Sequence, residues 1–303
     1  MPSLRARLIG LMIDLLGPWR MFTSEEALRR GLRTLRARPL ARPTARMRRK
    51  FAVESRMSDG QEIIRIAPKS AGRGRVLYLH GGGYVEPAVA SHWSFIADMV
   101  GRLGLEFVVP RYPLAPEHDV EKTMSVMLAL YGQLIQDHQH TPLIVMGDSA
   151  GGGLALALLQ EVRRLGLPMS AGLILISPWL DATMTAPEQA RIEPKDVFLR
   201  RAGLLAAARW YAGPLPLEHP WVSPLNGPLD GLPPILVFGS DHDILVTDAR
   251  RFVERAEGRH PSVAYHEVPG LFHDWPLVPV PFPEANAARA GIGVFVGRCL
   301  ASA

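Results

Sequence analysis

Residues 143–158 read LIVMGDSAGGGLALAL: an apolar run, a turn rich in glycine, and a run of alanine and leucine. The first run predicts a buried strand, and the last predicts a helix that begins near Ala150. Between them, residues 147–151 match the pattern G-x-S-x-G, in which a sharp turn from strand to helix exposes a serine hydroxyl. The flanking glycines leave room for this crowded turn, and the helix N-terminus favours developing negative charge. Ser149 is therefore the candidate nucleophile.

Short apolar runs alternate with helical patterns on both sides of this turn. We predict strands at residues 76–79, 105–110, 143–146, 173–177, 235–239 and 263–268, and helices at 93–99, 123–136, 150–165, 248–257 and 285–300. Such alternation is typical of an α/β protein with a mostly parallel sheet and helices on both faces.

Three other segments depart from this alternation. Residues 51–56 and 62–67 flank Asp59-Gly60, which predicts an antiparallel hairpin at the edge of the sheet. Residues 38–50, rich in Arg and Pro, are interpreted as a connector. Residues 181–232 break the alternation with prolines, and we expect them to form an insertion over the strand ends.

The length and composition fit a protein with a large core. The chain has 303 residues, of which 48% are apolar and 21% are charged. Residues 1–50 contain 13 Lys and Arg against 3 Asp and Glu, so they contribute +10 to a formal net charge of +5, and the remainder carries −5. We interpret the basic segment as a solvated helical face. It lacks a recognisable module with interleaved aromatics, so we expect no nucleic-acid partner.

The N-terminal segment does not have the pattern of a secretory signal. The apolar run after Arg5 and Arg7 is interrupted by Asp14, no clean cleavage site follows, and no run of 18 apolar residues occurs anywhere. Its leucines follow helical spacing, which fits a helix that lies weakly on a membrane surface or covers an apolar pocket. The lone Cys299 excludes an internal disulfide and fits a reducing compartment, so we expect a cytoplasmic protein, for which a homodimer is a candidate assembly.

A second glycine-rich loop, HGGGY at residues 80–84, follows an earlier predicted strand. Successive glycines let backbone N–H groups approach a substrate oxygen, and such donors need no reorganisation when charge develops on it. The N–H of Ala150, just after the nucleophile, would be a further donor. A phosphate-binding loop would require a lysine followed by Ser or Thr, and both are absent. We therefore predict an oxyanion hole.

A serine hydroxyl needs a histidine base at neutral pH, and position has to select among 10 histidines. His273 lies in PGLFHDW at residues 269–275, in a loop after the last predicted strand and at the sheet edge expected to bear Ser149. His260 and His266 fit less well, the latter because it falls inside a strand pattern.

The histidine in turn needs a carboxylate, which precedes it in the chain order Ser, acid, His. Asp241 and Asp243 both follow the strand predicted at residues 235–239, and their positions do not separate them. Asp274 is next to the histidine in sequence, and we expect it to point elsewhere.

Together these residues resemble the hormone-sensitive-lipase-like esterases, the bacterial family IV lipolytic enzymes. The motifs that carry the resemblance are HGGG at 80–83, YPLAPEH at 112–118, GDSAGG at 147–152, DIL at 243–245, and His273. The likeness covers residues 60 to 300, roughly, and the motifs are jointly specific. It implies an α/β-hydrolase fold, with a catalytic domain at residues 51–303 under a helical cap built from residues 1–50 and about 181–215.

The resemblance also implies which residues form the site. The family's oxyanion donors correspond to Gly82, Gly83 and Ala150, and its acid corresponds to Asp243, which decides against Asp241.

The chain departs from the family pattern in two places. Ile244 stands where proline is frequent, and Asp274-Trp275 stands where Gly-Phe is frequent. Neither change removes a catalytic group, although Trp275 is expected to reshape the pocket. In the cap, one set of apolar side chains is expected either to line an entrance or to pack as core: Leu8, Leu11, Leu15, Trp19 and Phe22.

The expected function is hydrolysis of short- to medium-chain acyl esters through an acyl-enzyme on Ser149, with His273 as base and Asp243 as its orienting acid. The partner is a small-molecule ester. No metal or cofactor is expected, because HExxH and zinc-spaced Cys and His are absent. Two alternatives are an amidase or arylformamidase on the same fold and a ligand receptor on an inactive hydrolase fold. The complete set of three residues counts against the receptor.

Overall fold

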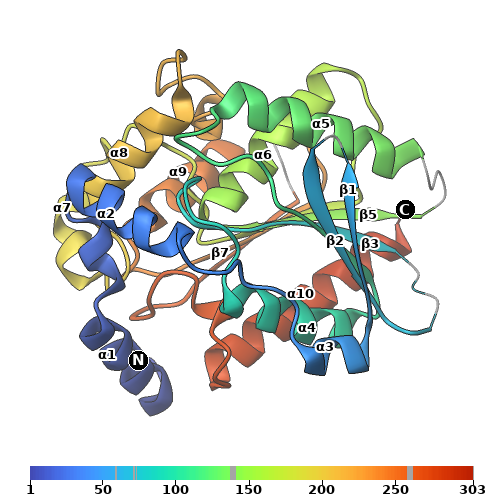
Figure 1. Ribbon diagram of the computed structural model, residues 1–303, viewed down its shortest axis with the longest axis horizontal. Helices are drawn as coiled ribbons and strands as arrows, with labels where there is room; N and C mark the ends of the chain where they lie inside the picture. The colour runs from blue at the N-terminus through green and yellow to red at the C-terminus, as the bar shows by residue number, and fades with distance from the viewer. Residues whose placement is uncertain (59, 71, 73, 137–140, 258–261, 303) are drawn as a thin grey trace.

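An eight-stranded sheet forms the centre of the computed structural model, which describes residues 1–58, 60–70, 72, 74–136, 141–257 and 262–302 (Figure 1). The strands are β1 (Ala52–Ser58), β2 (Gln61–Ala67), β3 (Arg75–Leu79), β4 (Glu106–Pro110), β5 (Leu143–Asp148), β6 (Gly172–Ile176), β7 (Ile235–Gly239) and β8 (Val263–Glu267). Their order is β1-β2-β4-β3-β5-β6-β7-β8. β2 pairs antiparallel with β1 and β4, and all other pairings are parallel. The predicted mostly parallel sheet is confirmed.

Helices cover both faces of this sheet. They are α1 (Leu4–Leu16), α2 (Glu25–Arg36), α3 (Ala45–Lys50), α4 (Ala90–Leu103), α5 (Val120–Gln136), α6 (Ser149–Arg164), α7 (Gln189–Ile192), α8 (Arg201–Ala212), α9 (Val246–Ala256) and α10 (Pro283–Ala301). α5, α6 and α9 pack on one face, and α4 and α10 on the other (Figure 1). Side chains alternate along β5 accordingly: Val145 joins the first core, whereas Ile144 and Met146 join the second.

The parallel strands bring distant loops to one edge of the sheet, because their carboxyl ends all lie on the same side. The glycine-rich loop follows β3, Ser149 follows β5, Asp243 follows β7, and His273 follows β8. These are the loops that the sequence predicts to carry the site.

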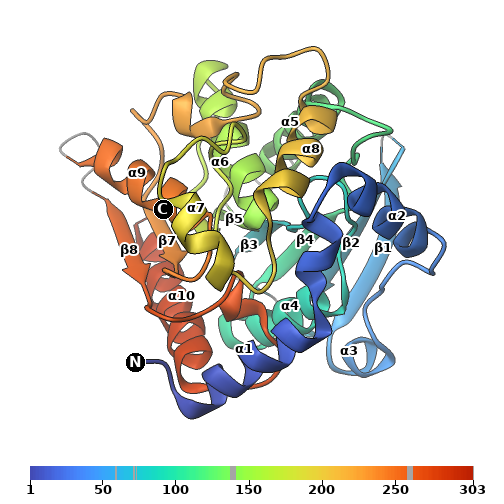
Figure 2. The same cartoon turned by 90° about the vertical axis from the view of Figure 1, so that its left-hand side faces the viewer.

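The N-terminal segment and the insertion after β6 lie against each other. Figure 2 shows α2 beside α8, and the 3-10 helix η1 (Pro18–Phe22) also contacts α8. The approach is close: a Cβ on Gly203 of α8 would lie 2.4 Å from the Cα of Phe22. The two segments are those assigned to a cap from the sequence, and their status as a separate domain stays a prediction.

Two expectations about the N-terminal half are wrong. Residues 38–50 are not all connector, because α3 occupies the second half, with the Thr44 hydroxyl accepting the N–H of Met47 at 3.3 Å. In α1 the buried face is Ala6, Ile9 and Ile13. Leu8, Leu11 and Leu15 are exposed and are not among the residues that line the cavity at Ser149, whereas Phe22 of the same predicted set does line it. Apolar residues occur all round this helix, and their spacing therefore does not select the buried face.

The predicted hairpin is present as β1 and β2, which pair from Ser58 opposite Gln61. Gly60 in the turn has φ of 79°, a left-handed conformation that glycine adopts without strain, while Asp59 lies outside the described residues. Across the part of the chain that the structure describes, no helix combines the length and the hydropathy needed to cross a membrane.

Candidate active site

Ser149 occupies the sharp turn between β5 and α6 and is buried at 5% exposure. Its φ of 51° is left-handed, a strained conformation for serine. The turn is possible only with glycine on either side. A Cβ on Gly147 would lie 2.2 Å from the carbonyl oxygen of Gly151, and one on Gly151 would lie 2.1 Å from that of Leu79. The sequence predicts both the strain and its cause.

A continuous hydrogen-bonded relay links Ser149 to two other buried side chains. The Nε2 atom of His273 lies 2.9 Å from the Oγ of Ser149, and its Nδ1 lies 2.8 Å from the Oδ2 of Asp243. Asp243 accepts a hydrogen bond from the N–H at Nδ1, which leaves Nε2 free to accept the serine proton. The backbone N–H of Leu245 donates to the other oxygen of Asp243 at 2.9 Å and fixes that carboxylate. The arrangement can move a proton away from the serine hydroxyl.

The other candidates from the sequence lie outside this relay. Asp241 accepts the backbone N–H of Gly270 instead of contacting the imidazole. His266 lies in β8, is exposed, and stacks on Phe238 with ring centroids 5.5 Å apart. His260 lies outside the described residues.

The glycine-rich loop after β3 stands next to the serine. Gly82 has φ of 122° and Gly83 has φ of 58°, both in the region that favours glycine. Within the described residues, no acceptor of the protein takes the N–H groups of Gly82, Gly83 or Ala150. Unpaired backbone donors beside a nucleophile can stabilise negative charge on a substrate oxygen.

Asp148, the residue before the nucleophile, holds this loop in place from within the core. It accepts the N–H of Gly81 at 2.9 Å, the Nε2 proton of His92 at 3.1 Å, and the hydroxyl of Tyr78. Burial would raise the pKa of Asp148, but His92 and the hydroxyl of Tyr78 outweigh it and lower the pKa below its ordinary value. Sequence reasoning missed this network, because nothing in the spacing links His92 to the turn.

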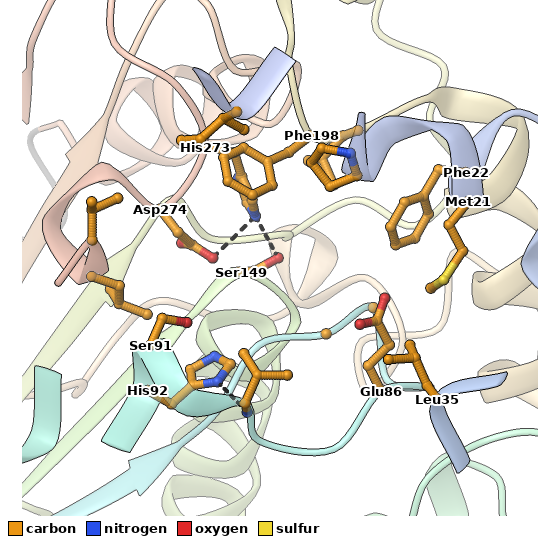
Figure 3. Close-up of a pocket in the computed structure, with 18 of the residues that line it drawn as sticks. Met21, Phe22, Leu35, Glu86, Ser91, His92, Ser149, Phe198, His273 and Asp274 are labelled. Atoms are coloured by element: carbon orange, nitrogen blue, oxygen red, sulfur yellow. Dashed lines mark hydrogen bonds and ion pairs between the residues drawn. The ribbon is translucent and has the colours of Figure 1, made fainter. Parts of the chain in front are cut away.

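The expectation that Asp274 points away from the site is wrong. Its Oδ2 lies 3.2 Å from the Nε2 of His273, the same atom that faces Ser149 (Figure 3). A left-handed backbone, with φ of 52°, turns the side chain inward, and the N–H of Asp274 donates to the Oγ of Ser177 at 3.2 Å. The position of Asp274 next to His273 in the sequence does not predict that its side chain points into the site.

The contact between Asp274 and the imidazole requires a proton. A carboxylate and an unprotonated Nε2 are both acceptors and cannot hydrogen-bond each other. Burial raises the pKa of Asp274 to about 7, and the nearby His273 opposes that increase. Burial alone would lower the pKa of His273, but Asp243 and Asp274 outweigh it and hold the pKa well above its ordinary value. The pair therefore retains a proton to higher pH than an isolated histidine would.

A cavity of about 730 Å³ opens in front of Ser149. Its walls are mostly apolar, and Figure 3 shows Met21, Phe22, Leu35 and Phe198 among them. These side chains come from the N-terminal segment and from the insertion after β6. The cavity can enclose the chain of a small ester while its carbonyl reaches the serine.

Two further points concern the lining of the cavity. Trp275 lies in the core, where it packs edge-on against Phe238 at 6.1 Å, and it is not among the lining residues, so the expectation that it reshapes the pocket is wrong. Among the described residues, no group of three or more His, Cys, Asp and Glu side chains has the arrangement of a metal site.

Comparisons with known proteins identify the family and the fold. Residues 76–277 match a protein family whose description is "alpha/beta hydrolase fold". An esterase of Acinetobacter venetianus is 33% identical over 222 residues, which are 73% of each chain. The crystal structure of EstE5 soaked with ethyl alcohol superposes with a TM-score of 0.86 at 26% identity, over 99% of both chains. That of EstE7, an HSL homologue from a metagenome library, shares the fold with a TM-score of 0.83 at 23% identity, over 99% of this chain and 100% of that one.

Proposed function

The chain belongs to the α/β-hydrolase family, in the branch of hormone-sensitive-lipase-like esterases, and from this premise we propose that it hydrolyses short- to medium-chain acyl esters with Ser149 as nucleophile. It is a serine hydrolase acting on carboxylic esters. The observation that supports the proposed residues most directly is the relay in which His273 contacts both Ser149 and Asp243.

Acylation begins when the Oγ of Ser149 attacks the ester carbonyl carbon and its proton passes to the Nε2 of His273. The carbonyl oxygen becomes an oxyanion, which the N–H groups of Gly82, Gly83 and Ala150 stabilise. As the tetrahedral intermediate collapses, the C–O bond to the alcohol breaks, and the proton on Nε2 moves to the departing oxygen. The products are a free alcohol and an acyl group on Ser149.

Deacylation repeats these steps with water. His273 takes a proton from a water molecule, whose oxygen attacks the acyl carbon. Collapse of the second intermediate breaks the bond to Ser149, which recovers its proton from Nε2, and the carboxylic acid departs. Asp243 orients the imidazole throughout and stabilises its charged form.

A chain-length series of p-nitrophenyl esters tests this proposal, with a matched p-nitroanilide at each length. We expect the highest kcat/KM at short to medium acyl length, because the cavity is apolar but limited to about 730 Å³. The anilides should react much more slowly. Faster turnover of the anilides would favour the amidase alternative, and no turnover of either series by folded protein would favour the ligand receptor.

A weak contact with membrane surfaces is a second proposal, and it is supported by α1. Its exposed face carries several leucines, among them Leu11 at 58% exposure and Leu15 at 72%. Arg5 and Arg7 flank this face, and the cavity lining includes Met12 and Ile13 from the same helix. An apolar face with basic flanks suits anionic lipid. The cap as a domain, the homodimer and the cytoplasmic location stay predictions from the sequence.

A further inference from the structure

Glu86 stands on the turn that carries the proposed oxyanion donors. Its backbone N–H donates to the carbonyl oxygen of Gly82 at 2.9 Å, which closes the turn. Its Cβ lies so near that a Cβ on Gly82 would be 2.9 Å away. The side chain lines the cavity, and in Figure 3 its carboxylate points into the open space, with Ser149 between it and Asp274. The backbone thus fixes an acid in the same cavity as Ser149.

This carboxylate has no polar partner within the part of the protein that the structure describes. No hydrogen bond or ion pair reaches it, and the labelled side chains on its side of the cavity in Figure 3, which are Met21, Phe22 and Leu35, are apolar. The nearby guanidinium of Arg36 is occupied, because it donates to the carbonyl oxygens of Val85 and Ala115 and pairs with Glu117. Glu86 therefore holds no element of the fold together.

The other charged or titratable groups that line the cavity do not neutralise Glu86. They are Arg38, which is exposed, and His92, His273 and Asp274. Burial raises the pKa of Glu86 to about 7, and His92 opposes that increase only in part. Asp274 adds a second acidic group, whose Oδ1 is buried without a hydrogen-bond partner among the described residues. The cavity thus contains two acidic side chains, and the carboxylate of Glu86 is not paired with a cation in the described part of the protein.

A partly buried carboxylate without a partner costs free energy, which a positively charged ligand can recover. We propose that Glu86 forms a subsite for a protonated primary amine, so that the enzyme prefers esters that carry an ammonium group on a short chain near the carbonyl. This inference rests on the proposed ester hydrolysis. The ammonium donates to the carboxylate of Glu86 while the carbonyl faces Ser149, and the chain between them lies along the apolar wall.

Paired substrates of equal shape test the subsite. On the acyl side, p-nitrophenyl 6-aminohexanoate is compared with p-nitrophenyl heptanoate; on the alcohol side, 6-aminohexyl butyrate is compared with heptyl butyrate by acid release. The quantity measured is the ratio of kcat/KM, amine over alkyl, at pH 7.5. We expect the wild-type ratio to exceed 1 on one side, and we expect Glu86→Gln to lower that ratio about tenfold or more, since a charge-assisted hydrogen bond is lost.

Glu26→Gln is the matched control, because Glu26 is exposed on α2 and its loss changes the net charge equally. This control should keep the wild-type ratio. Ratios of 1 or below on both sides, or a ratio that Glu86→Gln leaves unchanged, would overturn the subsite while ester hydrolysis stands. Folded wild-type protein that hydrolyses none of the four esters would overturn the proposed function and the subsite together.

Discussion

Asp274 gives the imidazole of His273 a second carboxylate neighbour, on the nitrogen that must accept the serine proton. Catalysis requires an unprotonated Nε2, whereas the contact at 3.2 Å is stable only when the pair holds a proton. The raised pKa of His273 means that this proton is lost only as the pH rises through the pair's apparent pKa. The value of kcat/KM should therefore increase with pH over that range.

Replacing Asp274 by asparagine should move the acid limb of the kcat/KM profile to lower pH by about one unit, because one cause of the raised pKa is removed. Asparagine also tolerates the left-handed backbone at this position. Asp14→Asn, an exposed substitution of the same kind on α1, should leave the limb in place. Coinciding profiles of Asp274→Asn and the wild type would rule out a titrating role for the pair.

At the scale of single residues, the sequence predicts those that a local motif defines. The positions of Ser149 and of the glycines follow from one turn and one loop. Position alone does not decide whether Asp241 or Asp243 is the acid, since both follow the same strand. The directions of Asp274 and Glu86 are beyond sequence reasoning, because they depend on a left-handed backbone and on how a turn closes.

Close contact between β3 and α6 makes the elements around the nucleophile intolerant of added atoms. In Gly151→Ala, the new methyl group would lie 2.1 Å from the carbonyl oxygen of Leu79 and 2.5 Å from that of His80. We expect the free energy of unfolding to decrease by about 1–3 kcal/mol, as measured by chemical denaturation, and kcat/KM to decrease as the oxyanion loop shifts.

The matched control is Gly132→Ala in the interior of α5, where no atom lies within 4 Å of the added Cβ. Alanine is the better helix former, so this variant should be more stable than the wild type by about 0.5–1 kcal/mol. If the two variants unfold at the same denaturant concentration, close packing at the turn is not the reason that residue 151 must be glycine.

The insertion after β6 is fastened to the relay by Asp196. Its carboxylate accepts the N–H groups of Phe198 and Leu199, both at 2.8 Å, and that of Ile244 at 2.9 Å. Ile244 directly follows Asp243, and Phe198 meets the ring of His273 edge-on at 6.3 Å. The wall of the cavity and the relay are therefore positioned by one side chain, which no motif in the sequence distinguishes.

Elements with a strong pattern were predictable, and those without one were not. The buried parallel strands are continuous apolar runs, and each lies within two residues of its predicted position. The helix α3 carries four basic residues in six positions, so it lacks the apolar period that predicts a helix. In α1 the apolar residues recur with helical spacing. They occur on all sides of the helix, however, so the spacing does not indicate which face is buried.

Over the whole molecule, charge and exposed apolar surface coincide in the N-terminal segment. Residues 1–50 are strongly basic, and α1 carries an exposed row of leucines beside the cavity. The double variant Leu11→Gln/Leu15→Gln should bind phosphatidylglycerol-rich vesicles more weakly than the wild type in a sedimentation assay at low salt.

Met57→Gln/Val294→Gln is the control for this assay, since both side chains are exposed and lie on β1 and α10. It should bind the vesicles as the wild type does, and binding of the wild type should weaken as salt is added. If the wild type does not sediment with the vesicles at low salt, or if both double variants lose vesicle binding equally, the proposed membrane contact is wrong.

Labelling with a fluorophosphonate, followed by peptide mass spectrometry, tests most directly that Ser149 is the activated nucleophile. The wild type should gain one adduct, on the peptide that contains Ser149, and that adduct should be absent from folded Ser149→Ala, whose kcat should fall by about four orders of magnitude or more. An unlabelled wild type that still hydrolyses esters, or an adduct on another residue, would contradict the proposed nucleophile.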